Sequence, residues 1–73
     1  MASAVFKFGS TAQWVQEKAC DLTRAKGVEA IIKLSGPINS GTLTLVGDDA
    51  SIEAAKKDIT GDRILNNLFR LQS

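Results

Sequence analysis

The segment GTLTLVGDDASIEAAKKDI, residues 41–59, decides the fold, because it changes from the period of a strand to the period of a helix. Threonine and leucine alternate within residues 42–46, as in a strand with one buried face. Gly47 ends this strand, and Asp48 and Asp49 supply a cap and negative charge where a helix begins. The apolar positions that follow have helical spacing: Ile52, Ala55 and Ile59. The segment therefore predicts a strand followed at once by a helix.

A second strand is predicted upstream, over residues 28–34. Apolar side chains alternate along it, but Ile31 falls on the polar face, which indicates that this face is partly covered. Residues 36–41 between the two strands contain two glycines and a proline, and proline cannot donate to a ladder of hydrogen bonds. The two strands are therefore predicted to form a hairpin that is joined by this loop.

The N-terminal third of the chain predicts another strand and a helix. Residues 4–8 alternate with alanine and two phenylalanines on one face. The segment STAQ, residues 10–13, has the form of a capping box, in which the serine and the glutamine satisfy the first free amides of a helix. Apolar residues continue at helical spacing, and Gly27 lies where a left-handed C-terminal cap is expected. We therefore expect one helix over about residues 10–26.

The C-terminal residues predict a last amphipathic helix after the interruption at residues 60–62. Its apolar arc is about 160° wide and comprises five residues: Ile64, Leu65, Leu68, Phe69 and Leu71. The arc is wider than so small a core needs, and Leu65 and Phe69 form a face of their own. Either the helix packs on the core of the chain itself, or a neighbouring subunit covers part of the arc, and we favour a subunit contact through Leu65 and Phe69.

These elements predict a single α+β domain over residues 1–73, with the order β-α-β-β-α-α. A right-handed crossover makes the first two strands parallel and leaves room for the third strand between them, antiparallel to both. The expected architecture is a three-stranded antiparallel or mixed sheet with helices on one face, of ferredoxin-like or microcompartment-shell-like type.

The small size of the chain favours association. A domain of 73 residues buries only about 60% of its unfolded surface, and such domains add disulfides, metals or partners. The sequence has one cysteine and no histidine, so it predicts neither an internal disulfide nor a Cys/His metal site. Association with further copies of the chain is the remaining means of stabilisation.

Charge and the N-terminal sequence narrow the classes of partner. Nine basic and eight acidic side chains are spread along the chain, so nucleic-acid binding is not expected, although a patch assembled by folding stays open. Residues 1–4 lack the layout of a signal peptide, and no apolar segment approaches the length of a membrane span. A lone thiol without an export signal suggests a reducing compartment, and we expect the protein in the cytoplasm.

No group of residues predicts catalysis. Cys20 lies in the middle of a predicted helix without a neighbour that would stabilise its thiolate, so we interpret it as a packing residue. Asp48 and Asp49 are explained by helix capping rather than by a metal site. The loop over residues 36–41 leads into a strand and has no lysine, so it does not predict a phosphate site. We therefore expect no enzymatic activity, no catalytic residue, no metal and no cofactor.

The segment SGTLTLVGDDASIEAA, residues 40–55, resembles the third strand and second helix of bacterial microcompartment shell proteins, with spacing closest to their circularly permuted branch. Upstream, residues 19–22 and 27–29 resemble the end of that branch's first helix and its next strand. The resemblance implies a structural subunit whose flat hexamers tile edge to edge. It places the pore or contact loop at Gly36, Pro37, Ile38, Asn39, Ser40 and Gly41. It places Arg24 near the family's edge-contact lysine, and Trp14 on the same helix is a further candidate subunit contact.

A second resemblance competes for the same residues. Residues 42–59 are similar to the last strand and helix of a KH RNA-binding domain, and the order strand-helix-strand-strand-helix is nearly that of KH. KH domains clamp single-stranded nucleic acid with a Gly-x-x-Gly loop, which this sequence lacks. A KH-like nucleic-acid-binding module with a degenerate loop is therefore the alternative to a shell subunit.

Overall fold

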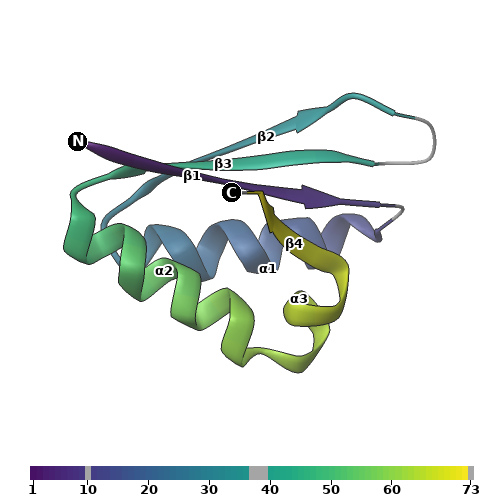
Figure 1. Ribbon diagram of the computed structural model, residues 1–73. Helices are drawn as coiled ribbons and strands as arrows, with labels where there is room; N and C mark the ends of the chain where they lie inside the picture. Colours follow the sequence, from purple (N-terminus) through teal and green to yellow (C-terminus); the bar gives the residue numbers. More distant parts are fainter. Residues whose placement is uncertain (10, 37–39, 73) are drawn as a thin grey trace.

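The computed structural model describes residues 1–9, 11–36 and 40–72. In chain order, the elements are β1 (Ala2–Phe8), α1 (Gln13–Arg24), β2 (Glu29–Leu34), β3 (Gly41–Gly47), α2 (Asp49–Gly61), α3 (Arg63–Leu68) and β4 (Phe69–Gln72). Within these residues, the four strands form one antiparallel sheet in the order β2-β3-β1-β4. All three helices lie against one face of the sheet, so the chain is an α+β protein (Figure 1).

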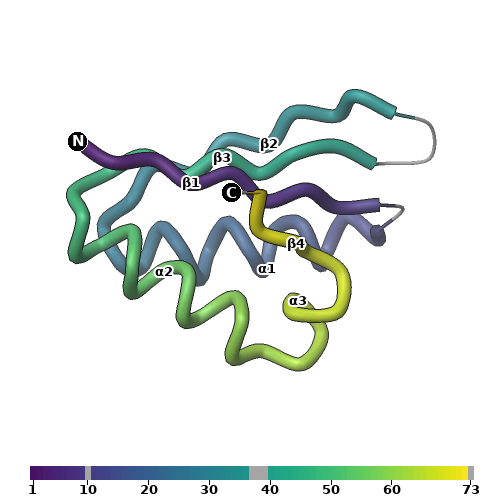
Figure 2. The backbone as a smooth tube through the Cα atoms, in the orientation of Figure 1, coloured from purple at the N-terminus to yellow at the C-terminus, as the bar shows by residue number. Residues whose placement is uncertain are grey.

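Two crossovers interleave in this sheet. The chain passes from β1 through α1 to β2, and β3 then returns between these two strands, antiparallel to both, as predicted. A second crossover leads from β3 through α2 and α3 to β4, which pairs with the other side of β1 (Figure 2). As a result, β1 and β3 lie in the centre of the sheet, and β2 and β4 form its two edges.

The fourth strand corrects the expected architecture. The sequence predicted three strands and a helix that extends to Leu71, but helix α3 ends at Leu68 and the chain continues as β4. Phe69 pairs with Phe8, and the two rings lie 5.0 Å apart between centroids at a tilt of 48°. Phenylalanine and leucine alternate with polar residues over 69–72, which fits the period of a strand as well as that of a helix. Because residues 69–72 pair with β1, they form a strand rather than a continuation of the helix.

The core lies between the sheet and the helices. Strand side chains that point toward the helices alternate with side chains on the other face, which no helix covers. Fifteen buried side chains form one cluster: Ala4, Phe6, Phe8, Val15, Ala19, Cys20, Val28, Ala30, Leu43, Leu45, Ile52, Ala55, Ile59, Leu65 and Phe69. The uncovered face of the sheet is called the open face below.

Helix α1 begins later than the sequence predicted. Its N-cap is Ala12, which makes no side-chain capping bond, so the expected capping box is not the cap of this helix, and Ser10 lies outside the described residues. Thr11 is buried and its Oγ1 accepts a hydrogen bond from Nε2 of Gln16 at 3.1 Å. At the other end, Gly27 has a φ of 84°, which confirms the predicted left-handed residue after the helix.

Aspartates begin both C-terminal helices. Asp48 Oδ1 accepts from the amide of Ser51 at 2.7 Å, which confirms the predicted cap of α2 and lowers the pKa of Asp48. Asp62 Oδ1 accepts from the amides of Ile64 and Leu65, and its Oδ2 lies 3.0 Å from Nζ of Lys18 on α1. The amide of Leu65 and the Lys18 ammonium lower the pKa of Asp62. Asp62 therefore caps α3 and also ties it to α1.

Among the described residues, no helix combines the length and the apolar character that spanning a bilayer requires.

Candidate functional site

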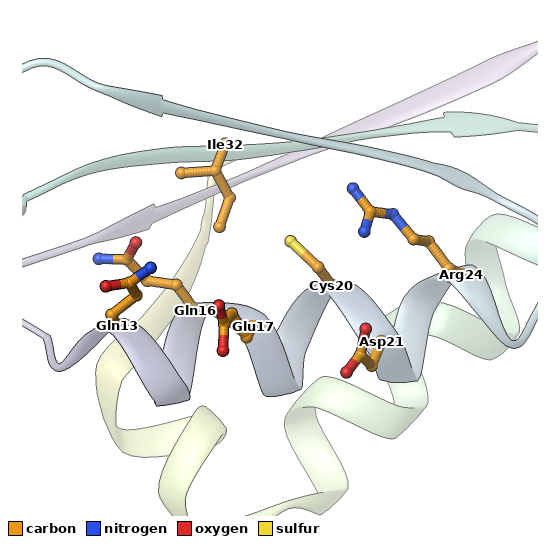
Figure 3. A pocket seen from close by; sticks show the side chains of 7 residues that line it. All are labelled: Gln13, Gln16, Glu17, Cys20, Asp21, Arg24 and Ile32. Atoms are coloured by element: carbon orange, nitrogen blue, oxygen red, sulfur yellow. The ribbon is translucent and has the colours of Figure 1, made fainter.

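A groove of about 400 Å³ runs between α1 and the edge strand β2. It is lined by Gln13, Gln16, Glu17, Cys20, Asp21, Arg24 and Ile32. Six of these residues come from one side of α1, because positions three and four apart in a helix share a face. Figure 3 shows Ile32 reaching from β2 toward the helix, and the Arg24 side chain rising from α1 toward the strands. The groove therefore combines the apolar side chain of Ile32 with charged and amide side chains of α1.

The opposite side of α1 holds the helix in this orientation. Lys18 is paired with Asp62, and Nζ of Lys26 lies 3.5 Å from a carboxylate oxygen of Asp58. The first pair joins α1, and the second pair joins the turn that follows α1, to the C-terminal half of the chain. The groove-lining side of α1 is therefore held toward β2.

Cys20 in this groove is not an activated thiol. It is buried, and burial raises the pKa of its thiol more than the nearby guanidinium of Arg24 lowers it. Asp21 and Glu17 raise the pKa further. In the described part of the chain, no cluster of three or more cysteine or acidic side chains is placed to hold a metal ion. The groove thus offers binding contacts without a nucleophile that is ionised at neutral pH.

The backbone of β2 gives this groove its second feature. Antiparallel strands alternate between residue pairs that exchange both backbone hydrogen bonds and pairs that exchange none. The amide of Ser35 donates to the carbonyl of Ser40 at 3.0 Å, and these residues continue the register of β2 with β3. By alternation, Ile31 and Lys33 direct their amides and carbonyls toward β3. The backbone groups of Ala30, Ile32 and Leu34 point away from the sheet and form a free edge.

Arg24 covers one end of this free edge. Its Nη2 donates to the carbonyl oxygen of Ala30 at 3.2 Å, which agrees with an outward direction for that carbonyl. The described residues contain no strand beyond β2. Unpaired edges promote pairing with other chains, and proteins often cover them with charged side chains. In the single chain, Arg24 supplies the hydrogen-bond donor for the Ala30 carbonyl. The outward backbone groups of Ile32 and Leu34 remain accessible for pairing.

Two large apolar side chains on β2 remain exposed. Leu34 is 54% exposed and lies on the same strand face as Ile32. Ile31 is 47% exposed and lies on the open face, so the deviation from alternation in the sequence does not reflect cover within the chain. An edge strand with free backbone groups and exposed apolar side chains is a surface for strand addition.

The predicted contact residues are scattered over the structure. Trp14 is 56% exposed on α1, where a partner has access to it. In the predicted pore or contact loop, the amide of Gly36 donates to the carbonyl of Ser40 at 3.3 Å, and Pro37, Ile38 and Asn39 lie outside the described residues. Gly41 belongs to β3 instead of the loop, and it is buried between Phe8 and Leu34 in the sheet register.

The predictions for two contact residues are wrong. Leu65 and Phe69 were expected to face another subunit, but both are buried in the core. The arc of the expected helix was too wide because Phe69 is a strand residue, and β4 turns it beneath the sheet against Phe8. Ile64 and Leu71 are the members of that arc with large exposed areas.

The sequence placed β2 at an edge of the sheet, because β3 was expected between β1 and β2, and this agrees with the structure. It did not show which backbone groups of β2 point outward. The outward direction of Ala30, Ile32 and Leu34 depends on the register with β3, which is not written in the sequence of the strand itself.

Comparison with models of known protein families, with curated protein sequences and with solved structures finds no significant match.

Proposed function

We propose that this chain is a structural, self-associating protein that pairs with a second copy of itself through the free edge of β2. The observation that supports this most directly is the outward backbone of Ile32 and Leu34 beside a groove that already holds Ile32. Strand addition to an exposed edge gains main-chain hydrogen bonds, and the neighbouring groove accommodates alternate side chains. No catalytic step is assigned to the site.

A two-fold antiparallel pairing centred on Ile32 makes this edge complementary to itself. Ile32 then lies opposite Ile32 of the second copy, and Ala30 lies opposite Leu34 of the second copy. The small alanine leaves space beside the exposed leucine, which is directed to the groove side of the sheet. On the open face, Glu29 comes diagonal to Lys33 of the second copy, so the charged ends attract each other.

Arg24 has a defined role in this pairing. The amide of Leu34 from the second copy approaches the carbonyl of Ala30, which Arg24 occupies in the single chain. Displaced from this carbonyl, the guanidinium is free to move along the groove toward Asp21 or Glu17, which line the same groove. Arg24 therefore shields the carbonyl of Ala30 in the single chain, and it leaves this carbonyl when the amide of a second copy takes its place.

The more specific predictions, which concern the fold type and the two family resemblances, differ in how well they are supported. The order β-α-β-β-α-β with interleaved crossovers is that of a ferredoxin-like arrangement, and it supports this more specific fold. A microcompartment shell subunit and its hexamer remain a prediction from the resemblance of residues 40–55. The KH-like alternative lacks its Gly-x-x-Gly loop, and α1 lies where KH places a broken pair of helices.

Substitution of Leu34 by proline is the test of β2 pairing. The Leu34 amide points away from β3, so proline removes a donor for the second copy while it leaves the ladder of the chain itself intact. We expect Leu34→Pro to fold and to sediment as a monomer under conditions in which the parent chain associates. Sedimentation velocity at concentrations from about 10 μM to about 1 mM measures this, because dimerisation follows mass action.

Leu34→Ala is the matched control. It removes the exposed side chain but keeps the amide, and we expect it to retain a weaker tendency to associate. A parent chain that is monomeric over the whole concentration range contradicts the proposal. Association that survives Leu34→Pro unchanged assigns the interface to another surface.

A further inference from the structure

A row of four residues crosses the four strands on the open face, and three of its side chains are positive. The register places Lys33 beside Thr42, Thr42 beside Lys7 and Lys7 beside Arg70. These four residues are called the cationic row. Adjacent strands lie about 4.8 Å apart, so the row extends over about 14 Å in a nearly straight line. Folding thus aligns charges that the sequence holds in three separate segments.

The cationic row has no acidic neighbour to neutralise it. In the described strands, the acidic residue of the open face is Glu29, which lies four residues from Lys33 and about 13 Å away along β2. The ion pairs of the described residues involve Lys18, Lys26 and Lys56, and none involves the row. Lys7 and Arg70 are directly opposite each other, an arrangement that destabilises a sheet unless an anion lies between the charges.

The surface is hollowed at the end of this row. A depression of about 440 Å³ is lined by Lys7, Phe8, Gly9, Ser40, Leu68, Arg70 and Gln72. It therefore places two cations and two polar side chains beside the half-buried Leu68, whereas the Phe8 side chain is buried in the core. No acidic side chain lines it. Such a hollow suits a ligand that carries both an anionic group and a flat apolar part.

We infer that the open face binds the backbone of a single-stranded nucleic acid, with successive phosphates along the cationic row and one base at the hollow. A linear polyanion fits charges that are spaced along a line better than a compact anion does. The open face carries no aromatic side chain in its described strands, because Phe6, Phe8 and Phe69 point into the core. Binding without stacking platforms is independent of base sequence, weak and strongly dependent on salt.

A membrane surface fits the same charges less well. Ile31 is the one large, strongly exposed apolar side chain on the open face among the described residues, and it lies outside the cationic row. The proposed β2 pairing continues the sheet and leaves this face uncovered. Nucleic-acid binding is therefore a property of each chain and does not depend on self-association.

Fluorescence anisotropy with a labelled twelve-nucleotide DNA strand of mixed sequence tests the inference. For single strands, each neutralised phosphate contributes about −0.7 to the slope of log K against log salt concentration. Three cations predict a slope near −2, so affinity falls about 100-fold between about 20 and about 200 mM salt. The measurement is made on the chain and on Leu34→Pro, which separates nucleic-acid binding from association.

Two row variants and one matched control decide the result. Lys7→Gln and Arg70→Gln are each expected to reduce the magnitude of the slope by about 0.7. If Lys7→Gln impairs folding, Arg70→Gln provides the test instead, because Arg70 lies on an edge strand. Lys57→Gln removes the same charge from the exposed helical side of the chain and is expected to leave the slope unchanged. Equal losses in all three variants overturn the inference, as does tighter binding of a duplex of the same length or no binding at about 20 mM salt.

Discussion

Leu65→Asp is expected to prevent folding of the chain. Leu65 is 0% exposed and belongs to the same core cluster as Ile59 and Phe69. Replacing it removes a buried leucine, and an aspartate at this position has no partner for its charge in the apolar cluster. The combined loss is at least about 4 kcal/mol, which is comparable with the whole stability of a domain of this size. Far-ultraviolet circular dichroism and thermal unfolding measure the effect.

Ile64→Asp is the matched control, because it makes a similar change one residue earlier. Ile64 is 40% exposed and lies in the first turn of α3, where a negative charge is favourable. We expect this variant to fold with stability close to that of the parent. A folded Leu65→Asp that has merely lost association would restore Leu65 to a subunit interface and refute the core assignment.

Gly41→Ala is expected to cause the second-largest loss of stability. A Cβ atom at Gly41 would meet the carbonyl oxygen of Lys33 and lie 2.8 Å from the Cα atom of Leu34. Both contacts are with backbone atoms of the paired strand β2, so the clash is relieved only by separating β2 from β3. Overpacking of this kind costs about 1–3 kcal/mol, and we expect the upper part of this range. Chemical denaturation measures the change in the free energy of unfolding.

Gly61→Ala makes the same chemical change, and we expect it to have the opposite effect on stability. A Cβ atom at Gly61 meets nothing within 4 Å, and the residue ends helix α2. Alanine there restricts the unfolded chain without a clash, so it should stabilise the protein by about 0.4–1 kcal/mol. If Gly41→Ala proves as stable as the parent, the close approach of β2 and β3 at this position is wrong.

Local sequence signals were sufficient for the central elements of the fold. At the junction of β3 and α2, the change of period coincides with Gly47 and with the Asp48 cap, so several signals agree on one boundary. The placement of β3 between β1 and β2 followed from the handedness of crossovers. These inferences needed no knowledge of contacts between distant segments.

The C-terminal strand could not be predicted in the same way. Four residues that alternate between apolar and polar are too few to distinguish a strand from a continued helix. Phe69 becomes a strand residue because β1 offers it a free edge and Phe8 offers it a ring contact. Because the helix was expected to continue past residue 68, Leu65 was grouped with Phe69 on one helical face and was wrongly assigned to a subunit contact.

The cationic row and the outward backbone groups of β2 were missed for a related reason. The cationic row takes Lys7 and Arg70 from opposite ends of the chain, and their neighbourhood exists only through the register of β1 with β4. The free edge of β2 is a property of backbone groups, which every sequence has. Neither composition nor motif spacing records such features.

Amide hydrogen exchange in β2 tests β2 pairing most directly. In the pairing we propose, the outward amides of Ile32 and Leu34 become hydrogen-bonded only when a second copy is present. Their protection should therefore rise between about 10 μM and about 1 mM protein, while the inward amides of Ile31 and Lys33 stay protected throughout. Exchange of Ile32 and Leu34 at the rate of open amides at every concentration would contradict the account.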